Sequence, residues 1–92
     1  MRNADFHTGD VKKCCENKLG IHFKKGGELN GWYKVSDKKI ARITIPKGKK
    51  PIPPKTYKSM AAQLKLNIDQ FDSLLDCILT GNDYKHIIKN AL

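Results

Sequence analysis

One aromatic side chain and several polar ones recur at alternate positions in the middle of the chain. Trp32 and Lys34 are two residues apart, as are Arg42 and Thr44. Because successive side chains of a β-strand point to opposite faces, each pair shares one face of its strand. If both faces point outward, they form a platform that can stack an unpaired base and neutralise phosphate. The alternative is that Trp32 belongs to the core, because tryptophan is highly buried on average.

A second group of cations lies in a proline-rich loop and the helix expected after it. Its members are Lys47, Lys49, Lys50, Lys55 and Lys58. Pro53 or Pro54 suits the first turn of a helix, where a missing N–H costs nothing. Backbone N–H groups at a helix N-terminus favour anions, so these lysines predict a phosphate-binding site. The alternative is a solvated basic loop, since the glycine spacing of a P-loop is absent.

The distribution of charge favours a polyanionic partner. The 92-residue chain carries 18 Lys and Arg against 9 Asp and Glu, for a formal net charge of +9. Residues 22–65 hold 12 basic side chains and 2 acidic ones, whereas residues 66–84 hold four Asp and neither Lys nor Arg. A concentrated positive region attracts polyanions and raises their association rate. RNA or DNA is the predicted partner, and a basic surface that serves only solubility is the alternative.

Residues that catalyse reactions or bind metals are sparse. His22 is the one histidine beside the basic segment and the only local candidate for a general base, although a lone strand histidine is more often a surface residue. Cys14, Cys15 and Cys77 match neither a disulfide framework nor a zinc site. We expect reduced thiols, no metal and no cofactor. Without a membrane-spanning run or a signal peptide, a cytoplasmic location is expected.

Apolar periodicity predicts the elements that carry these side chains. Helical spacing indicates helices over residues 11–19, 54–64, 67–79 and 84–91. Alternating or β-branched stretches indicate strands over residues 21–24, 32–35 and 40–45. The order α-β-β-β-α-α-α predicts an α+β fold, a three-stranded antiparallel sheet with helices on one face. The other face is then solvated, as the platform requires.

Several helix boundaries carry signals of their own. Gly20 is expected to end the first helix. Asn67, with Gln70 three residues on, is close to a capping box for the third. Thr80 with Gly81 is expected to close that helix, and Asn82 or Asp83 to cap the fourth. The buried stripe of the third helix is predicted to be Phe71, Leu74, Leu75, Ile78 and Leu79.

A short motif spans the end of the third strand and the helix after it. It contains Ile45-Pro46 and then Lys49-Lys50-Pro51-Ile52-Pro53-Pro54-Lys55-Thr56-Tyr57-Lys58-Ser59-Met60-Ala61-Ala62-Gln63. This stretch resembles the HicA family of toxins, in which a strand ending in Val-Pro precedes the pattern Lys-Lys-x-Leu-Pro-x-x-Thr-Leu-x-Ser-Ile-x-x-Gln. These are small ribonucleases with the α-β-β-β-α fold of double-stranded-RNA-binding domains. The length of 92 residues fits a single domain, 1–92, and the resemblance implies such a core over 8–66, with a helical extension over 67–92.

The chain departs from the family at the catalytic position. The family's histidine lies in a Gly-Ser-His motif at the start of the second strand, and the corresponding position falls near Asn30. An amide cannot take up a proton near pH 7, so the resemblance implies RNA binding and leaves ribonuclease activity open. The added residues 67–92 are expected to cover the helices, to hold a second subunit, or to replace the contact of a separate antitoxin.

Two other function classes remain open. Residues 59–79 look like a helix-turn-helix, which would place the 67–79 helix in a DNA major groove. That helix carries Asp69, Asp72 and Asp76 and neither Lys nor Arg, and carboxylates repel phosphate. The other class is a protein-interaction module of a toxin–antitoxin-like system. Its acidic helix would then hold a basic partner or the basic face of a second copy.

Overall fold

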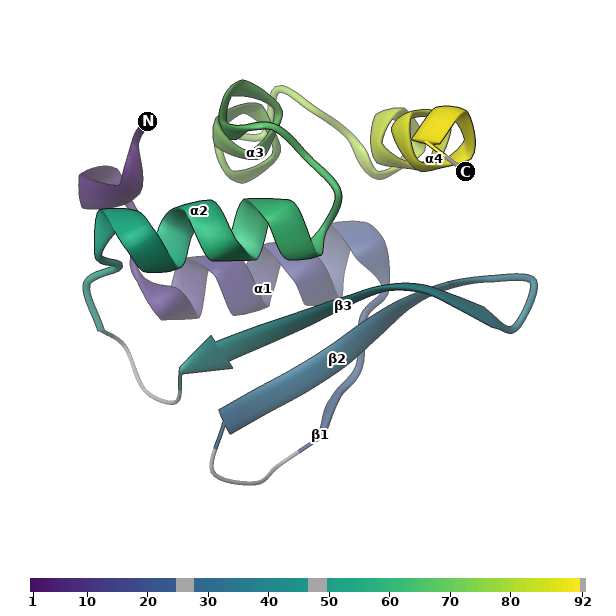
Figure 1. The fold of residues 1–92 in the computed structure, drawn as a ribbon, viewed down its shortest axis with the longest axis horizontal. Helices are drawn as coiled ribbons and strands as arrows, with labels where there is room; N and C mark the ends of the chain where they lie inside the picture. Colours follow the sequence, from purple (N-terminus) through teal and green to yellow (C-terminus); the bar gives the residue numbers. More distant parts are fainter. Residues whose placement is uncertain (25–27, 47–49, 92) are drawn as a thin grey trace.

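The computed structural model describes residues 1–24, 28–46 and 50–91. Its elements are the 3₁₀ helix η1 (Asn3–Asp5), α1 (Thr8–Leu19), β1 (Phe23–Lys24), β2 (Glu28–Val35), β3 (Lys38–Pro46), α2 (Pro54–Gln63), α3 (Ile68–Leu75) and α4 (Gly81–Ala91). The strands form one antiparallel sheet in the order β1-β2-β3 (Figure 1). The predicted α+β fold and its order of elements are confirmed. Among the described helices, none is long and apolar enough to cross a membrane.

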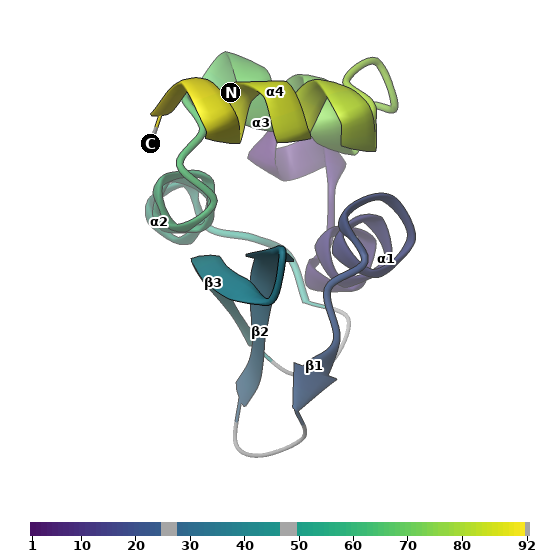
Figure 2. The same ribbon diagram turned by 90° about the vertical axis from the view of Figure 1, so that its right-hand side faces the viewer.

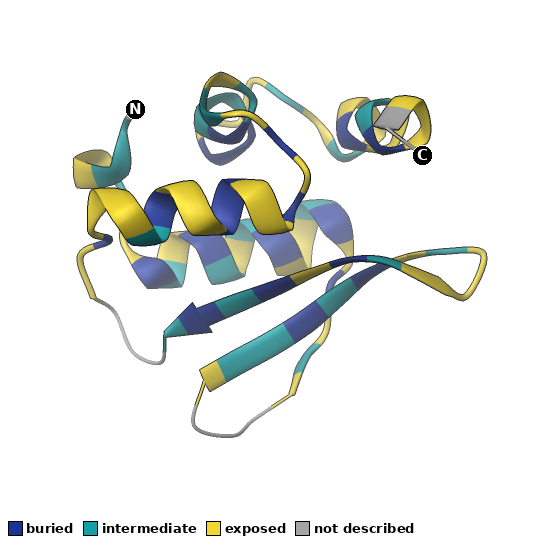
Figure 3. Ribbon diagram, viewed as in Figure 1, coloured by how far each residue is buried: buried dark blue, intermediate teal, exposed yellow. Residues whose placement is uncertain are grey.

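The elements are arranged in three layers (Figure 2). The sheet forms one layer, α1 and α2 cover one of its faces, and α3 and α4 lie beyond those two helices. Alternation along β3 decides which side chains face the helices. Ala41, Ile43 and Ile45 are buried, whereas Arg42 is exposed and Thr44 is half-buried (Figure 3). This is the division between inner and outer faces that the sequence predicts.

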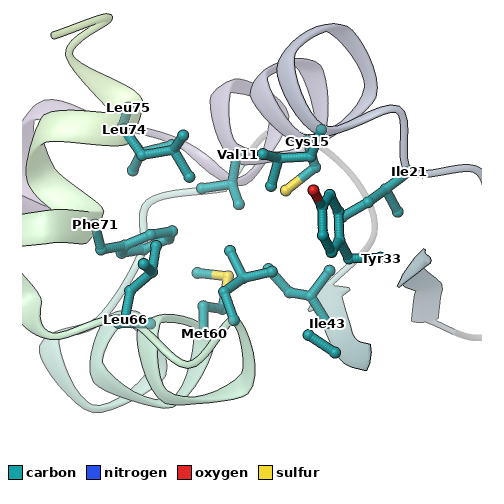
Figure 4. Close-up of a cluster of buried hydrophobic side chains, with 14 of the residues drawn as sticks. Val11, Cys15, Ile21, Tyr33, Ile43, Met60, Leu66, Phe71, Leu74 and Leu75 are labelled. Carbon is teal, nitrogen blue, oxygen red and sulfur yellow. The ribbon is translucent and has the colours of Figure 1, made fainter. Parts of the chain in front are cut away.

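One hydrophobic core joins the three layers. Val11 and Cys15 of α1 meet buried side chains of the sheet, α2 and α3 (Figure 4). Helix α4 adds Tyr84 and Ile88, both fully buried. The Tyr84 ring meets Tyr33 edge to face at 4.7 Å, and its hydroxyl donates a hydrogen bond to the Leu64 carbonyl at 2.9 Å. Helices α3 and α4 therefore contribute to the same core as the α-β-β-β-α part.

Helix α3 ends earlier than predicted. Its last residue is Leu75, and Cys77 follows with a φ of 66°. The N–H groups of Cys77 and Ile78 donate to the carbonyls of Leu74 and Ser73, at 3.4 and 3.0 Å. These are the bonds of a Schellman motif, which usually has glycine in the left-handed position. The buried stripe predicted to reach Leu79 is wrong at Ile78, which is 71 % exposed.

The boundary between α3 and α4 also differs from the prediction. Thr80 caps the start of α4 and does not close α3, because its hydroxyl accepts from the Asp83 N–H at 3.1 Å and its N–H donates to the Asp83 carboxylate at 3.0 Å. The cap predicted at Asn82 or Asp83 is therefore wrong, since both residues lie inside α4. Gly81 then lies against the end of α1, where a Cβ would be 2.3 Å from the Lys18 carbonyl oxygen. The capping box predicted at Asn67 and Gln70 is confirmed.

Candidate nucleic-acid interface

Trp32 lies in the middle of β2, on the sheet face that no helix covers. Its neighbours Gly31 and Tyr33 are buried on the helix side, while Trp32 itself is half-buried. Gly31 allows the segment before β1 to close onto the sheet, since a Cβ there would be 2.4 Å from Ile21 Cγ2 and 2.9 Å from Phe23 Cδ1. Strand β2 therefore has glycine, which lacks a side chain, on its inner face and the Trp32 indole on its outer face.

Three cations among the described residues lie near the indole of Trp32. The ammonium of Lys39 lies 4.4 Å from the ring centroid, the guanidinium of Arg42 lies 5.6 Å away and the ammonium of Lys24 lies 6.0 Å away. Distances up to about 6 Å are those at which a cation is attracted by the negative face of an aromatic ring. Because the three cations come from β1 and β3, the flanking strands both supply charge to the ring of the central strand. We call Trp32, Lys24, Lys39 and Arg42 the Trp32 cluster.

A β-bulge brings Lys39 into this cluster. Tyr33 pairs with Ala41 and Lys34 pairs with Lys39, so Ile40 has no partner on β2. An extra residue of this kind changes the phase of side-chain alternation along the bulged strand. Without the bulge, Lys39 would share the inner face with Ala41 and Ile43. The bulge therefore turns Lys39 outward, and alternation alone could not predict this position.

The guanidinium of Arg42 is held by its neighbours on the outer face. Arg42 Nη2 donates to Asn30 Oδ1 at 3.0 Å, and Thr44 Oγ1 donates to the same oxygen at 2.8 Å. The Thr44 N–H donates to Gln63 Oε1 of α2 at 2.9 Å. Asn30 thus occupies the centre of a hydrogen-bond network that orients Arg42 beside the indole. No sequence signal singled out Asn30 or Gln63 for this purpose.

The remaining predicted lysines fall in two groups. Lys34 is exposed on β2, two residues from Trp32, and pairs with Lys39. Lys50, Lys55 and Lys58 are exposed before and along α2. A shallow cleft between β3 and α2 is lined by Thr44 and Lys55 and also by Glu28, so the platform and Lys55 adjoin there. Lys47 and Lys49 lie outside the described residues.

His22 does not lie on a strand, although the sequence places it there. The Ile21 N–H donates to the Cys15 carbonyl at 3.1 Å, so the chain is still bonded to the end of α1 at this point. Strand β1 comprises only Phe23 and Lys24, and Lys24 is the residue opposite Asn30. His22 is exposed, and within the described part of the chain it has no hydrogen bond or ion pair. In that same part, no three His, Cys, Asp or Glu side chains gather as metal ligands would.

Two acidic residues are engaged within the chain, Asp72 on α3 and Asp76 directly after it. Asp72 Oδ1 accepts from the Tyr57 hydroxyl at 2.5 Å and from the Arg2 N–H at 3.1 Å. Asp76 forms an ion pair with the Arg2 guanidinium. Hydrogen bonds to Asp5 and Asp76 raise the pKa of that guanidinium above its ordinary value. The N-terminal segment therefore occupies part of the acidic surface expected to hold a partner.

Comparison with protein-family models, with curated proteins and with solved structures finds no match for this chain. The HicA resemblance therefore stays a prediction from the motif at residues 45–63.

Proposed function

We propose that this chain binds single-stranded RNA on the outer face of its sheet. The observation that carries the proposal is the Trp32 cluster, a half-buried indole with three cations within 6.0 Å. An aromatic ring stacks any base through its π-face, and neighbouring cations neutralise the phosphates on either side. We expect a base of the RNA to displace the Lys39 ammonium from the ring. That ammonium can then pair with a neighbouring phosphate of the RNA.

The proposal specifies single strands because of the way the ring is presented. Bases inside a duplex are already stacked on both faces, so a duplex presents no free base to an indole on a flat sheet face. Lys34 beside the cluster, and Lys50, Lys55 and Lys58 near α2, extend the positive surface along which a phosphate backbone would run. RNA is chosen over DNA because of the HicA-like motif, and the same proposal implies a cytoplasmic location.

The intrinsic fluorescence of the protein provides the test. Trp32 is the only tryptophan of the chain, so quenching by an unstructured oligoribonucleotide reports directly on this ring. We expect quenching by single strands and much weaker quenching by a duplex of equal charge. Affinity is expected to fall steeply with salt, with a logarithmic slope of about −0.7 for each phosphate contact of a single strand. Unchanged fluorescence with every RNA and DNA at low salt would exclude the proposal and favour a protein-interaction module.

A pair of charge-matched variants separates the cluster from overall charge. Lys39→Ala and Lys89→Ala each remove one exposed ammonium, the first beside Trp32 and the second on α4 in the layer away from the sheet. We expect Lys39→Ala to weaken RNA binding several-fold and Lys89→Ala to change it little. Equal losses in the two variants would indicate nonspecific attraction by the net charge alone.

A further inference from the structure

Two of the three cysteines meet where α1 contacts the end of α3. A small cavity at this point is lined by Phe6, Cys14, Leu75 and Cys77 among others. Cys14 is half-buried on α1, and Cys77 is exposed in the left-handed position that ends α3. They are far apart in the sequence, and nothing in the spacing of the cysteines indicated that they would share a cavity.

One carbonyl oxygen fixes how close the two cysteines are. The Cys14 sulfur donates to the Leu74 carbonyl at 3.5 Å, and the Cys77 N–H donates to the same oxygen at 3.4 Å. Because both atoms contact one oxygen at those distances, the Cys14 sulfur lies less than about 7 Å from the Cys77 nitrogen. Disulfides join residues whose Cα atoms are about 4.4–6.8 Å apart. Cys77 is exposed and lines the same cavity as Cys14, so rotation of its side chain turns its sulfur toward Cys14, and closing the bond requires the two Cα atoms to come within that range.

We propose that Cys14 and Cys77 are a disulfide-forming pair, which closes when the chain meets a peroxide. The Cys77 sulfur attacks a peroxide oxygen and breaks the O–O bond, giving a sulfenic acid and one water. The Cys14 sulfur then attacks the Cys77 sulfur, the S–O bond breaks, and the hydroxide leaves as a second water with the Cys14 proton. Two thiols and one hydrogen peroxide thus yield one disulfide and two waters.

The surroundings of the cysteines decide their order of reaction. Cys77 is exposed, so it is the thiol that peroxide reaches first. Burial raises the pKa of Cys14 to about 11, so Cys14 is a slow first target and reacts when a neighbouring electrophilic sulfur is presented to it. Cys15 is fully buried in the core, where burial raises its pKa further, and is left out of the pair.

The bond would connect α1 to the α3–α4 connection. It would close a loop that contains the whole sheet and α2, and long closed loops restrict the unfolded chain strongly. We therefore expect the oxidised protein to melt at a temperature higher by about 5 °C or more. This inference is independent of RNA binding, since the Trp32 cluster belongs to the sheet and the cysteine pair to the helical layers.

Thiol counting after treatment with hydrogen peroxide tests the pair. Wild type is expected to lose two thiols and about 2 Da, and to regain both with dithiothreitol. Because trypsin leaves Cys14 and Cys15 in one peptide, mapping is done in Cys15→Ala, where a peptide linking Cys14 to Cys77 is expected. Cys77→Ser should abolish both the mass change and the rise in melting temperature. A monomer that keeps three thiols, a Cys14–Cys15 bond, or a disulfide only between two chains would overturn the proposal.

Discussion

Trp32 is the side chain on which the proposed RNA binding depends most. Stacking of one base on an aromatic ring contributes about 1–3 kcal/mol. Trp32→Ala is therefore expected to weaken binding of a fluorescently labelled oligoribonucleotide by roughly 5- to 150-fold, measured by anisotropy. Trp32→Phe keeps a ring and should retain part of the affinity. Equal losses in the two variants would contradict stacking, provided that circular dichroism shows both to be folded.

Asn30 sets the expectation for catalysis. Its amide oxygen accepts bonds from Arg42 and Thr44, and the resemblance predicts that the catalytic histidine of the HicA family falls near this position. Loss of a general base typically costs 10²–10⁴-fold in rate, so we expect RNA to be bound without efficient cleavage. A gel assay of RNA cleavage checks this with wild type, His22→Ala and Asn30→His. Efficient cleavage that disappears in His22→Ala would make His22 the base and refute the expectation, whereas cleavage gained by Asn30→His would support the family alignment.

The sequence indicated Trp32 and Arg42 of the Trp32 cluster but not Lys39 and Lys24. Trp32 and Arg42 were identified because they alternate with apolar residues on short, clear strands. Lys39 was missed because the bulge at Ile40 reverses the face it occupies, and a bulge depends on pairing that no single strand reveals. Lys24 was missed because its contribution depends on the register of β1 against β2. The pairing of each strand with its neighbour was thus the information needed, and the residue pattern of a single strand does not contain it.

At the scale of elements, α2 and α3 both end with a residue other than glycine in the left-handed conformation. Lys65 has a φ of 60°, and its N–H and that of Leu66 complete a Schellman motif with the carbonyls of Ala62 and Ala61, each at 2.9 Å. Such a conformation costs a side chain with a Cβ about 1 kcal/mol. Lys65→Gly is therefore expected to stabilise the fold by about 0.5–1 kcal/mol in urea titrations.

A matched control for Lys65→Gly lies on the same helix. Lys58→Gly also removes one exposed lysine, but from the interior of α2, where glycine costs about 1 kcal/mol relative to a good helix former. Opposite signs of the two changes are expected. If both destabilise, the left-handed strain at Lys65 is not what limits the end of α2.

The start of α4 makes stability depend on acid pH. Hydrogen bonds from the backbone N–H and then the hydroxyl of Thr80 lower the pKa of Asp83 below its ordinary value. Because the folded pKa is below the unfolded one, the bond stabilises the fold above about pH 4 and is lost as pH falls through the folded pKa. Asp83→Asn should lower the melting temperature at pH 7 but not at pH 2. A difference from wild type that persists at pH 2 would contradict this origin, and Glu28→Gln controls for loss of one exposed charge.

Element types could be predicted from the sequence more fully than element ends. Alternation in residues 40–45 and the Asn67–Gln70 box are local signals, and both hold in the structure. The end of α3 could not be predicted because Cys77 replaces the usual glycine. The Lys18 ammonium of α1 also bonds the carbonyls of Leu74 and Leu79, at 2.8 and 3.3 Å. The end of α3 thus depends on a hydrogen bond from α1 to one of its last carbonyls, and this contact between distant segments cannot be predicted from the local sequence.

At the scale of the whole molecule, we expect the two C-terminal helices to be needed for folding. Phe71, Leu74, Tyr84 and Ile88 are all fully buried. Each contributes about 1.5–3 kcal/mol of burial, and together they are comparable with the 5–15 kcal/mol that stabilises a typical domain. A chain that ends at Leu66 is therefore expected to be unfolded by circular dichroism. A cooperative melting transition in that shortened chain would contradict this and make residues 8–66 an autonomous unit.

The arrangement of charge gives the molecule two unlike ends. The Trp32 cluster lies on the sheet, and the acidic residues of α3 lie in the opposite layer (Figure 2). A polyanion approaching in solution is attracted more strongly by the sheet than by the opposite layer, where Lys85 and Lys89 of α4 offset the carboxylates of α3, so encounters are oriented before contact. The ion pairs of Arg2 with Asp5 and Asp76 reduce this asymmetry without removing it, because Asp69 is exposed and has no such partner among the described residues.

The side chain of Gln63 bears on whether copies of the protein associate through the edge of the sheet at high concentration. Strand β3 borders the sheet, and the unpaired backbone of a border strand is a template on which other chains polymerise. The side chain of Gln63 accepts the hydrogen bond from the outward N–H of Thr44, and Pro46 has no N–H group. The positive charges of Lys38, Lys39 and Arg42 add repulsion between two copies that approach along this edge. We therefore expect the cations of the proposed RNA-binding face also to oppose pairing of β3 with the β3 of another copy, and bound RNA to leave the Gln63–Thr44 hydrogen bond as the main remaining protection of that edge.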